Sequence, residues 1–153
     1  MFKAILEVIF GLFSRKWKLK RQRRIFFKRF YIALWTKIWS AEFKREQFRT
    51  ARESQRLEYD RCRENLEIVI EKVKTLNEVK EPTKDQVDKT KALKKDEEIY
   101  QSQIQKLKNQ LDQFDNAIEG VQDPKTGVLT GLTPDIDQNR ANMALLEEYR
   151  KHL

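Results

Sequence analysis

The chain has 153 residues, of which 39% are hydrophobic and 37% charged, with a mean hydropathy of −0.79 and a net charge of +8. This length predicts one domain, or a small domain with an appendage, and excludes a second catalytic module. The scarcity of Gly and Pro excludes a fold rich in turns. The single cysteine, Cys62, excludes an internal disulfide and a multi-cysteine zinc site.

The charge is concentrated at the N-terminal end. Residues 1–40 contain eleven Lys or Arg, one acid (Glu7), ten of the sixteen aromatic residues and all three Trp. This segment therefore carries a charge of +10, and the remaining 113 residues sum to −2. Because its aromatic side chains must be covered by something, the segment cannot be an ordinary solvated tail.

Residues 1–40 are predicted to form a basic, aromatic, amphipathic anchor helix or helices. Apolar residues recur at helical spacing on both sides of a cationic run at 15–24, in which seven of ten residues are basic. Three further apolar residues, Phe26, Ile32 and Trp39, fall off that face, which predicts that the second stretch is enclosed by lipid, by partner chains or by its own fold. The predicted apolar anchor comprises Phe2, Ile5, Leu6, Ile9, Phe10, Phe13, Trp17, Phe27, Phe30, Tyr31, Leu34, Trp35 and Ile38.

The same segment fits neither a signal peptide nor a spanning helix. Its cationic run follows the first apolar stretch, whereas a signal peptide has the positive charge first. Its longest charge-free runs, residues 8–14 and 30–36, are seven residues each, far short of the ~18–20 that a membrane-spanning helix needs. We expect a helix that lies on a surface, and no secretion through a cleavable signal peptide.

Residues 41–120 are predicted to form an antiparallel helical hairpin with coiled-coil character. Two stripes step alternately by three and four residues, which is typical of a coiled-coil seam. Between them Pro82 ends the first helix, Thr83 and Gln86 form a capping box for the second, and Gly120 terminates it. The predicted seam comprises Tyr59, Cys62, Leu66, Val69, Val73, Leu76, Ile104, Leu107, Leu111, Phe114 and Ile118.

The two stripes do not match in register. The strongest apolar positions lie near the turn on the first helix and far from it on the second. The second helix therefore pairs either with another subunit or with Phe43, Phe48 and Ala51 of its own chain. We favour the hairpin with additional partners on an outer face, because Leu57, Ile68 and Ile70 lie off the seam.

Residues 121–153 are predicted to form a loop and a C-terminal helix. The Asp-Pro-Lys-Thr-Gly sequence at 123–127 has turn chemistry and is flanked by short apolar pairs, which indicates a loop or a small β-hairpin. Thr133, Pro134 and Asp135 are typical of a helix start. This helix is expected to dock on the hairpin or on a neighbouring molecule.

The sequence thus predicts an all-α fold: an elongated helical hairpin or coiled coil with an N-terminal basic amphipathic helix and a short C-terminal helix. Its segments are residues 1–40, 41–120 and 121–153.

Enzymatic chemistry is not expected. His152 lies next to the C-terminus, no Gly-rich phosphate loop is present, and Cys62 sits on an apolar stripe as a small hydrophobic residue. Carboxylates such as Glu64, Glu67 and Glu71 lie among Lys and Arg at helical spacing, as in solvated pairs. We expect a non-enzymatic assembly protein with no cofactor, no metal and no small-molecule substrate.

Three functions compete for the N-terminal segment. It anchors the chain to an anionic membrane surface, it is buried in partner proteins of a large assembly such as a phage or virion component, or it contacts nucleic acid. Membrane anchoring is favoured because it uses both the apolar faces and the charges, with oligomerisation or partner docking through the coiled coil. The predicted anionic-surface residues are Arg15, Lys16, Lys18, Lys20, Arg21, Arg23, Arg24, Lys28 and Arg29.

Overall fold

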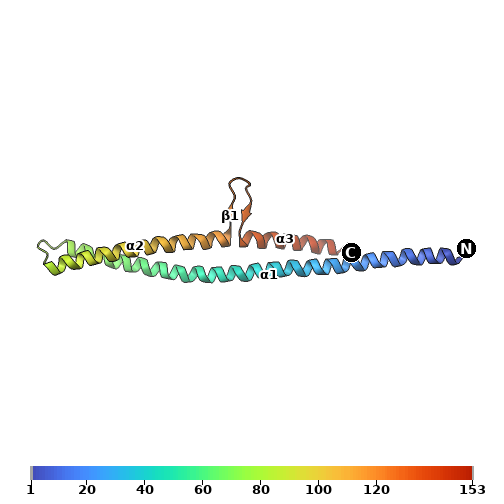
Figure 1. Ribbon diagram of the computed structural model, residues 1–153, viewed down its shortest axis with the longest axis horizontal. Coiled ribbons are helices and arrows are strands. Elements are labelled where there is room, and N and C mark those ends of the chain that lie inside the picture. Colours follow the sequence, from blue (N-terminus) through green and yellow to red (C-terminus); the bar gives the residue numbers. More distant parts are fainter. Residues whose placement is uncertain (1, 153) are drawn as a thin grey trace. The chain divides into compact units, whose positions relative to one another are not determined.

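A computed structural model describes the backbone of residues 2–152 and the side chains of residues 14–152. The described chain forms helix α1 (Phe2–Asn77), helix α2 (Lys84–Glu119), strands β1 (Val121–Gln122) and β2 (Leu129–Thr130), and helix α3 (Leu132–Arg150) (Figure 1). The predicted all-α class, with a helical hairpin and a short C-terminal helix, is confirmed. Six predicted anchor side chains lie outside the described ones: Phe2, Ile5, Leu6, Ile9, Phe10 and Phe13.

Helix α1 is a single helix, so the predicted anchor segment and the first arm of the hairpin belong to one element. The physical reason lies in the sequence, because neither Gly nor Pro occurs between residues 12 and 81 to interrupt the backbone hydrogen bonds. The helix ends at Asn77, shortly before Pro82.

Both predicted ends of α2 are confirmed. The Thr83 hydroxyl accepts a hydrogen bond from the Gln86 N–H at 3.3 Å, and the Gln86 side-chain oxygen accepts one from the Thr83 N–H at 3.0 Å. This reciprocal pair satisfies two amide groups that the first turn leaves open. At the other end Gly120 has a φ of 99° and donates its N–H to the Asn116 carbonyl at 3.0 Å.

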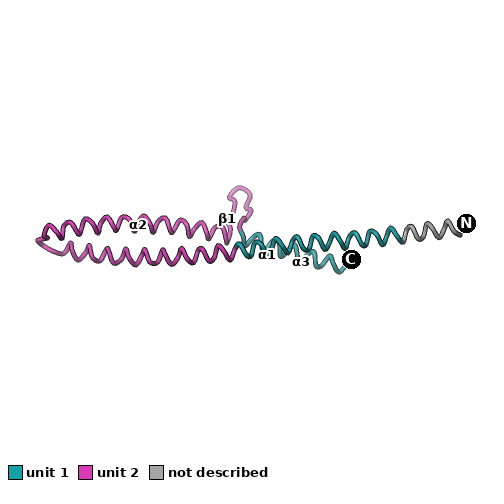
Figure 2. The backbone as a smooth tube through the Cα atoms, turned by 60° about the horizontal axis from the view of Figure 1, so that its bottom comes forward, with its two compact units in different colours: residues 1–44, 132–153 teal, residues 45–131 magenta. Residues whose placement is uncertain are grey.

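The chain divides into two compact units (Figure 2). We call residues 45–131 the hairpin unit and residues 1–44 with 132–153 the terminal unit. In the hairpin unit, α2 returns antiparallel alongside the second half of α1 (Figure 1).

Side chains of the predicted seam line the contact between the two arms of the hairpin unit. Cys62, Val69, Val73 and Ile118 are buried. The other seven are half-buried: Tyr59, Leu66, Leu76, Ile104, Leu107, Leu111 and Phe114. By contrast, the off-seam residues Leu57, Ile68 and Ile70 are exposed.

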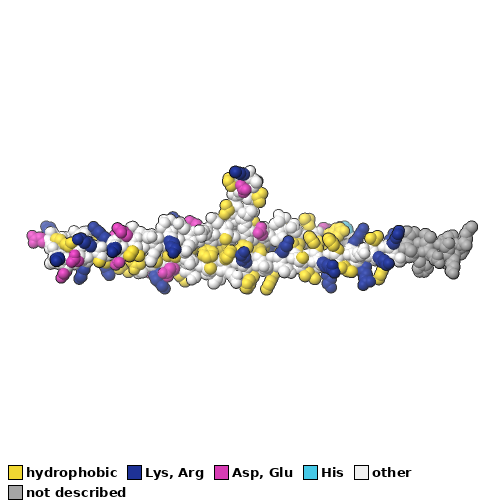
Figure 3. All heavy atoms as spheres, viewed as in Figure 1, with side chains coloured by type: hydrophobic (Ala, Val, Ile, Leu, Met, Phe, Trp, Pro, Cys, Tyr) yellow, Lys and Arg dark blue, Asp and Glu magenta, His cyan; other side chains and the backbone are white. Residues whose placement is uncertain are grey.

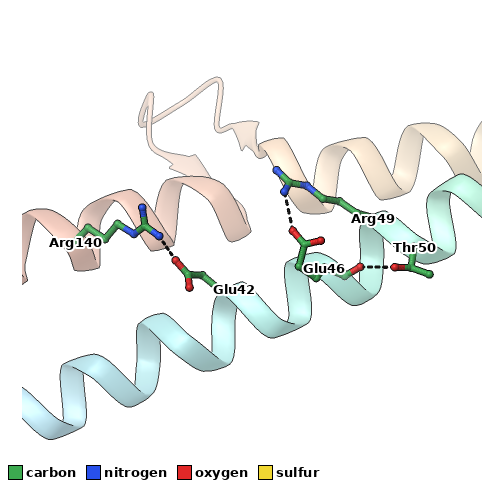
Figure 4. Close-up of polar contacts among 5 residues, drawn as sticks. All are labelled: Glu42, Glu46, Arg49, Thr50 and Arg140. Atoms are coloured by element: carbon green, nitrogen blue, oxygen red, sulfur yellow. Dashed lines mark hydrogen bonds and ion pairs between the residues drawn. The ribbon is translucent and has the colours of Figure 1, made fainter.

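Toward the N-terminal side of the seam, α1 and α2 still contact each other within the chain. The Phe48 and Phe114 rings meet edge to face with centroids 6.0 Å apart, and Arg52 Nε lies 2.6 Å from Asp115 Oδ1. Of the two alternatives for the second helix, the structure thus has the intramolecular one, in which Phe48 meets Phe114. Nearby on α1, Glu46 pairs with Arg49 at 2.8 Å, and its carbonyl accepts from the Thr50 hydroxyl (Figure 4).

Strands β1 and β2 form the small β-hairpin that the sequence indicated. Val121 pairs with Thr130, and Gln122 pairs with Leu129. The Asp123 carboxylate accepts the Lys125 N–H at 2.8 Å, and this backbone hydrogen bond holds the pKa of Asp123 below its ordinary value. Where the β-hairpin joins its flanking helices, a Cβ on Gly131 would lie 2.5 Å from the Gly120 Cα, so the two backbones touch.

In the terminal unit, α3 packs on the N-terminal part of α1. Leu34 and Ile38 of α1 are buried together with Met143 of α3, and Tyr31 packs against this cluster. Ile136 is also buried, and Arg140 forms an ion pair with Glu42 of α1 (Figure 4). The sequence placed this helix on the hairpin or on a neighbour, whereas the structure packs it on the predicted anchor segment.

Candidate functional site

The exposed side chains of residues 14–44 form the surface of most functional interest, and we call it the basic–aromatic surface. In Figure 3, Lys and Arg side chains are interspersed with hydrophobic ones along the coloured N-terminal part of α1. This surface belongs to the terminal unit alone.

Helical periodicity divides the apolar residues of this segment into a covered face and open faces. Leu34 and Ile38 are buried and Phe27 and Tyr31 half-buried, at the spacing of one helix face turned toward α3. The remaining large apolar side chains are exposed: Trp17, Leu19, Ile25, Phe26, Phe30, Ile32, Trp35, Trp39 and Phe43.

The predicted anchor is therefore split. Of its members with described side chains, four face α3, namely Phe27, Tyr31, Leu34 and Ile38, while Trp17, Phe30 and Trp35 are exposed. Phe26, Ile32 and Trp39, which fell off the predicted face, belong to the exposed set.

Sequence reasoning left Leu19, Ile25 and Phe43 out of the anchor. All three are exposed in the structure. The signal that could have found them was the width of the apolar arc, which exceeds what one short packing helix can cover.

Exposed aromatic rings on this surface stack along the helix. The Phe26 and Phe30 centroids lie 6.2 Å apart, and those of Trp39 and Phe43 lie 6.0 Å apart. Each pair is four residues apart, so the helix itself sets the contact. These stacks form contiguous apolar areas rather than isolated side chains.

The nine predicted cations of this surface, all within residues 15–29, are available to an external anion. All nine predicted anionic-surface residues are exposed, and none of them forms an ion pair with another described side chain. Arg21 lies over the Trp17 ring, 5.6 Å from its centroid, a contact that leaves its charge unneutralised.

The arginines of the hairpin unit behave differently. Arg52 pairs with Asp115, and four others form ion pairs with glutamates three or four residues away: Arg49, Arg56, Arg61 and Arg63. The contrast follows from the local composition, because the cationic run at 15–24 has no acid at helical spacing within it. A local excess of positive charge, with no acid nearby in the sequence, is therefore a property of the terminal unit's N-terminal segment.

The other residues with reactive or ionisable side chains that the sequence singled out do not come together in a site. Cys62 is buried, and its thiol donates a weak hydrogen bond to the Gln103 side-chain oxygen at 3.7 Å. Glu64, Glu67 and Glu71 are exposed on α1, and His152 lies in a terminal turn. Within residues 14–152, no group of His, Cys, Asp and Glu side chains is arranged to hold a metal ion.

The described helices also lack any stretch with the length and apolarity required to cross a bilayer. Comparison of the chain with protein-family models, with curated proteins and with solved structures found no match.

Proposed function

We propose that this protein is a non-enzymatic assembly component that attaches to an anionic membrane surface through its basic–aromatic surface. The observation that carries the proposal is a coincidence on one helix segment. Nine cations within residues 15–29 form no ion pair with a described side chain, and large exposed aromatic rings lie among them. Such a helix lies in the plane of the interface.

A membrane surface satisfies both kinds of side chain at once. Each Lys or Arg near an anionic leaflet contributes about 1 kcal/mol of attraction. Tryptophan favours the headgroup region, where its ring is covered and its N–H finds an acceptor. Cations that project to the other sides of the helix reach lipid phosphates through their long side chains.

Nucleic acid is the less favoured ligand, because it uses only half of the surface. Duplex phosphates neutralise Lys and Arg but leave rings such as Trp39 and Phe43 uncovered. Burial in a larger assembly would cover the rings but would require an acidic partner surface for the cations.

The hairpin unit would then carry the docking function. Its seam side chains are engaged between α1 and α2, so other molecules would contact the outer face, where Leu57, Ile68 and Ile70 are exposed. A rigid helical hairpin is a suitable spacer for such contacts.

Vesicle flotation of the full-length chain tests the membrane proposal. We expect flotation with vesicles that contain anionic phospholipid and little with phosphatidylcholine alone. Changing Lys18, Lys20 and Arg21 to Glu should abolish it. The matched control changes Lys91, Lys94 and Lys95 of α2 to Glu, an equal loss of charge in the hairpin unit, and should leave flotation intact.

Two results would contradict the proposal. The first is no flotation of the unmodified chain at about 0.1 M salt, where surface electrostatics still operate over roughly 10 Å. The second is equal loss in both charge variants, which would indicate a general dependence on net charge. Tight, salt-sensitive binding of a polynucleotide without vesicle binding would favour the nucleic-acid alternative.

A further inference from the structure

A groove in the terminal unit combines cations and apolar side chains in one place. It has a volume of about 680 Å³ and lies where the last turn of α3 meets α1. Its lining consists of Arg24, Phe27, Lys28, Tyr31, Ile32 and Arg150, with no acidic side chain among them.

The fold brings these six residues together in a defined way. Arg24 and Lys28 are one helical turn apart, as are Phe27 and Tyr31, whose rings stack with centroids 5.9 Å apart. Arg150 comes from the opposite helix. It lies seven residues after Met143 and so shares the face of α3 that packs on α1.

The electrostatics of the groove favour an anion. Three positive side chains border it, and none of the three has an ion-pair partner among the described side chains. Among the described acids at this end of α3, Glu148 is engaged with Lys151 at 3.0 Å. Guanidinium groups bind phosphate oxygens through two parallel hydrogen bonds, which makes Arg24 and Arg150 suited to a phosphate.

The apolar lining of the groove favours a phosphate that carries an apolar group over inorganic phosphate. Phe27, Tyr31 and Ile32 offer an apolar surface directly beside the cations, and Ile32 is exposed. Inorganic phosphate would leave this surface uncovered, whereas the glycerol and first acyl carbons of a phospholipid would cover it.

We propose that this groove binds the phosphate headgroup of a single anionic phospholipid, with Arg24, Lys28 and Arg150 on the phosphate and the aromatic pair beneath the acyl chains. The proposal rests on the proposed membrane function, to which it adds a discrete lipid site. The cations outside the groove supply general attraction, and the groove supplies recognition of one molecule.

The test is a calorimetric titration of the full-length chain with short-chain phosphatidic acid, kept monomeric below its micelle concentration. Short-chain phosphatidylcholine and inorganic phosphate are the comparison ligands. We expect phosphatidic acid to bind with a defined stoichiometry, and both comparison ligands to bind at least about tenfold more weakly, since each lacks either the net charge or the apolar part.

Matched variants locate the site. Arg150→Gln and Arg24→Gln should each weaken phosphatidic acid binding by about tenfold or more, the effect of losing a hydrogen bond between charged groups. Lys94→Gln removes the same charge from an exposed position of α2, in the hairpin unit and outside the basic–aromatic surface, and should change binding by less than about twofold. Circular dichroism of each variant checks that the helices persist.

Equal weakening by Arg150→Gln and Lys94→Gln would contradict a lipid site in the groove, as would equal affinity for phosphatidic acid and inorganic phosphate. Flotation keeps the two proposals apart. If the chain floats with anionic vesicles but the variants bind phosphatidic acid alike, the groove fails and membrane attachment stands. If the chain does not float, the membrane function itself fails.

Discussion

Ile38 and Ile32 lie six residues apart on α1 in contrasting surroundings. Ile38 is 2% exposed, against Met143 and Leu34, whereas Ile32 is 54% exposed. We expect Ile38→Ala to lower the free energy of unfolding of the terminal unit by about 2–4 kcal/mol, through lost burial and a cavity. Ile32→Ala, the control, should change it by less than about 1 kcal/mol. Chemical denaturation measures both, and equal effects would contradict the packing of α3 on α1.

The stability of the turn in the β-hairpin should depend on pH through the Asp123 carboxylate. Its pKa is lowered in the folded chain, mainly by the Lys125 backbone N–H, so the ionised carboxylate stabilises the turn. A lowered folded-state pKa means that this stabilisation is present above the ordinary carboxylate value, about 3.9, and is lost as the pH falls below it. The protection of the Lys125 amide against hydrogen exchange, taken relative to the intrinsic exchange rate at each pH, should therefore fall below about pH 4.

NMR of the Lys125 amide through a pH titration measures this effect. Asp123→Asn keeps an oxygen acceptor but cannot ionise, so its Lys125 amide should show no such step. A step of equal size in both proteins would mean that another group is responsible.

At the scale of elements, Gly131 sets how closely the ends of the β-hairpin approach. A Cβ there would lie 2.5 Å from the Gly120 Cα and 2.8 Å from its nitrogen, both backbone atoms that cannot rotate away. Gly131→Ala should therefore destabilise the hairpin unit by about 1–3 kcal/mol, as overpacking does.

Thermal unfolding followed by circular dichroism would show the change as a lower midpoint. Gly127→Asn is the control, because this position has room for a side chain and a φ of 70°, which asparagine tolerates. An unchanged midpoint for Gly131→Ala would contradict the close approach of the two backbones.

Local signals explain which elements could be predicted from the sequence. The capping box of Thr83 and Gln86, the terminator Gly120 and the turn at 123–127 each act within a few residues, and each is present. The position of α3 could not be predicted, because its apolar face at Ile136 and Met143 fits any exposed helix of similar pattern. Only the tertiary structure shows that Leu34 and Ile38 are its partners.

The sequence predicts the cations of the candidate site better than it predicts which apolar side chains are exposed there. The absence of acids at helical spacing in residues 15–24 is visible in the sequence, and the cations indeed have no described ion-pair partner. Exposure of Trp35 and Trp39 depends on which face α3 occupies, a fact of long-range packing. Arg150 carried no sequence signal, since it lies more than a hundred residues from Arg24 and Lys28.

For the whole molecule, deletion of residues 1–39 tests whether the two units are stabilised independently of each other. It removes Leu34 and Ile38, so α3 loses the core against which Ile136 and Met143 pack. Hydrogen exchange should become fast throughout α3 while α2 keeps its protection, since the Cys62 to Val73 seam remains intact.

Trp39→Ala in the full-length chain is the control for this deletion. It removes a side chain that is 68% exposed, and α3 protection should stay unchanged. Unaltered protection of α3 after the deletion itself would show that this helix does not depend on α1.

The placement of the tryptophans makes the chain its own spectroscopic reporter. Trp17, Trp35 and Trp39 all lie in the terminal unit and are at least about half exposed, and residues 45–131 contain none. Intrinsic tryptophan emission of the free chain should therefore be that of solvent-exposed indole. The emission maximum should move to shorter wavelength only when a lipid surface or a partner buries this segment. Quenchers dissolved in water or attached at known depths along a lipid chain would then report on the N-terminal segment without any label, because the hairpin unit contributes no tryptophan emission.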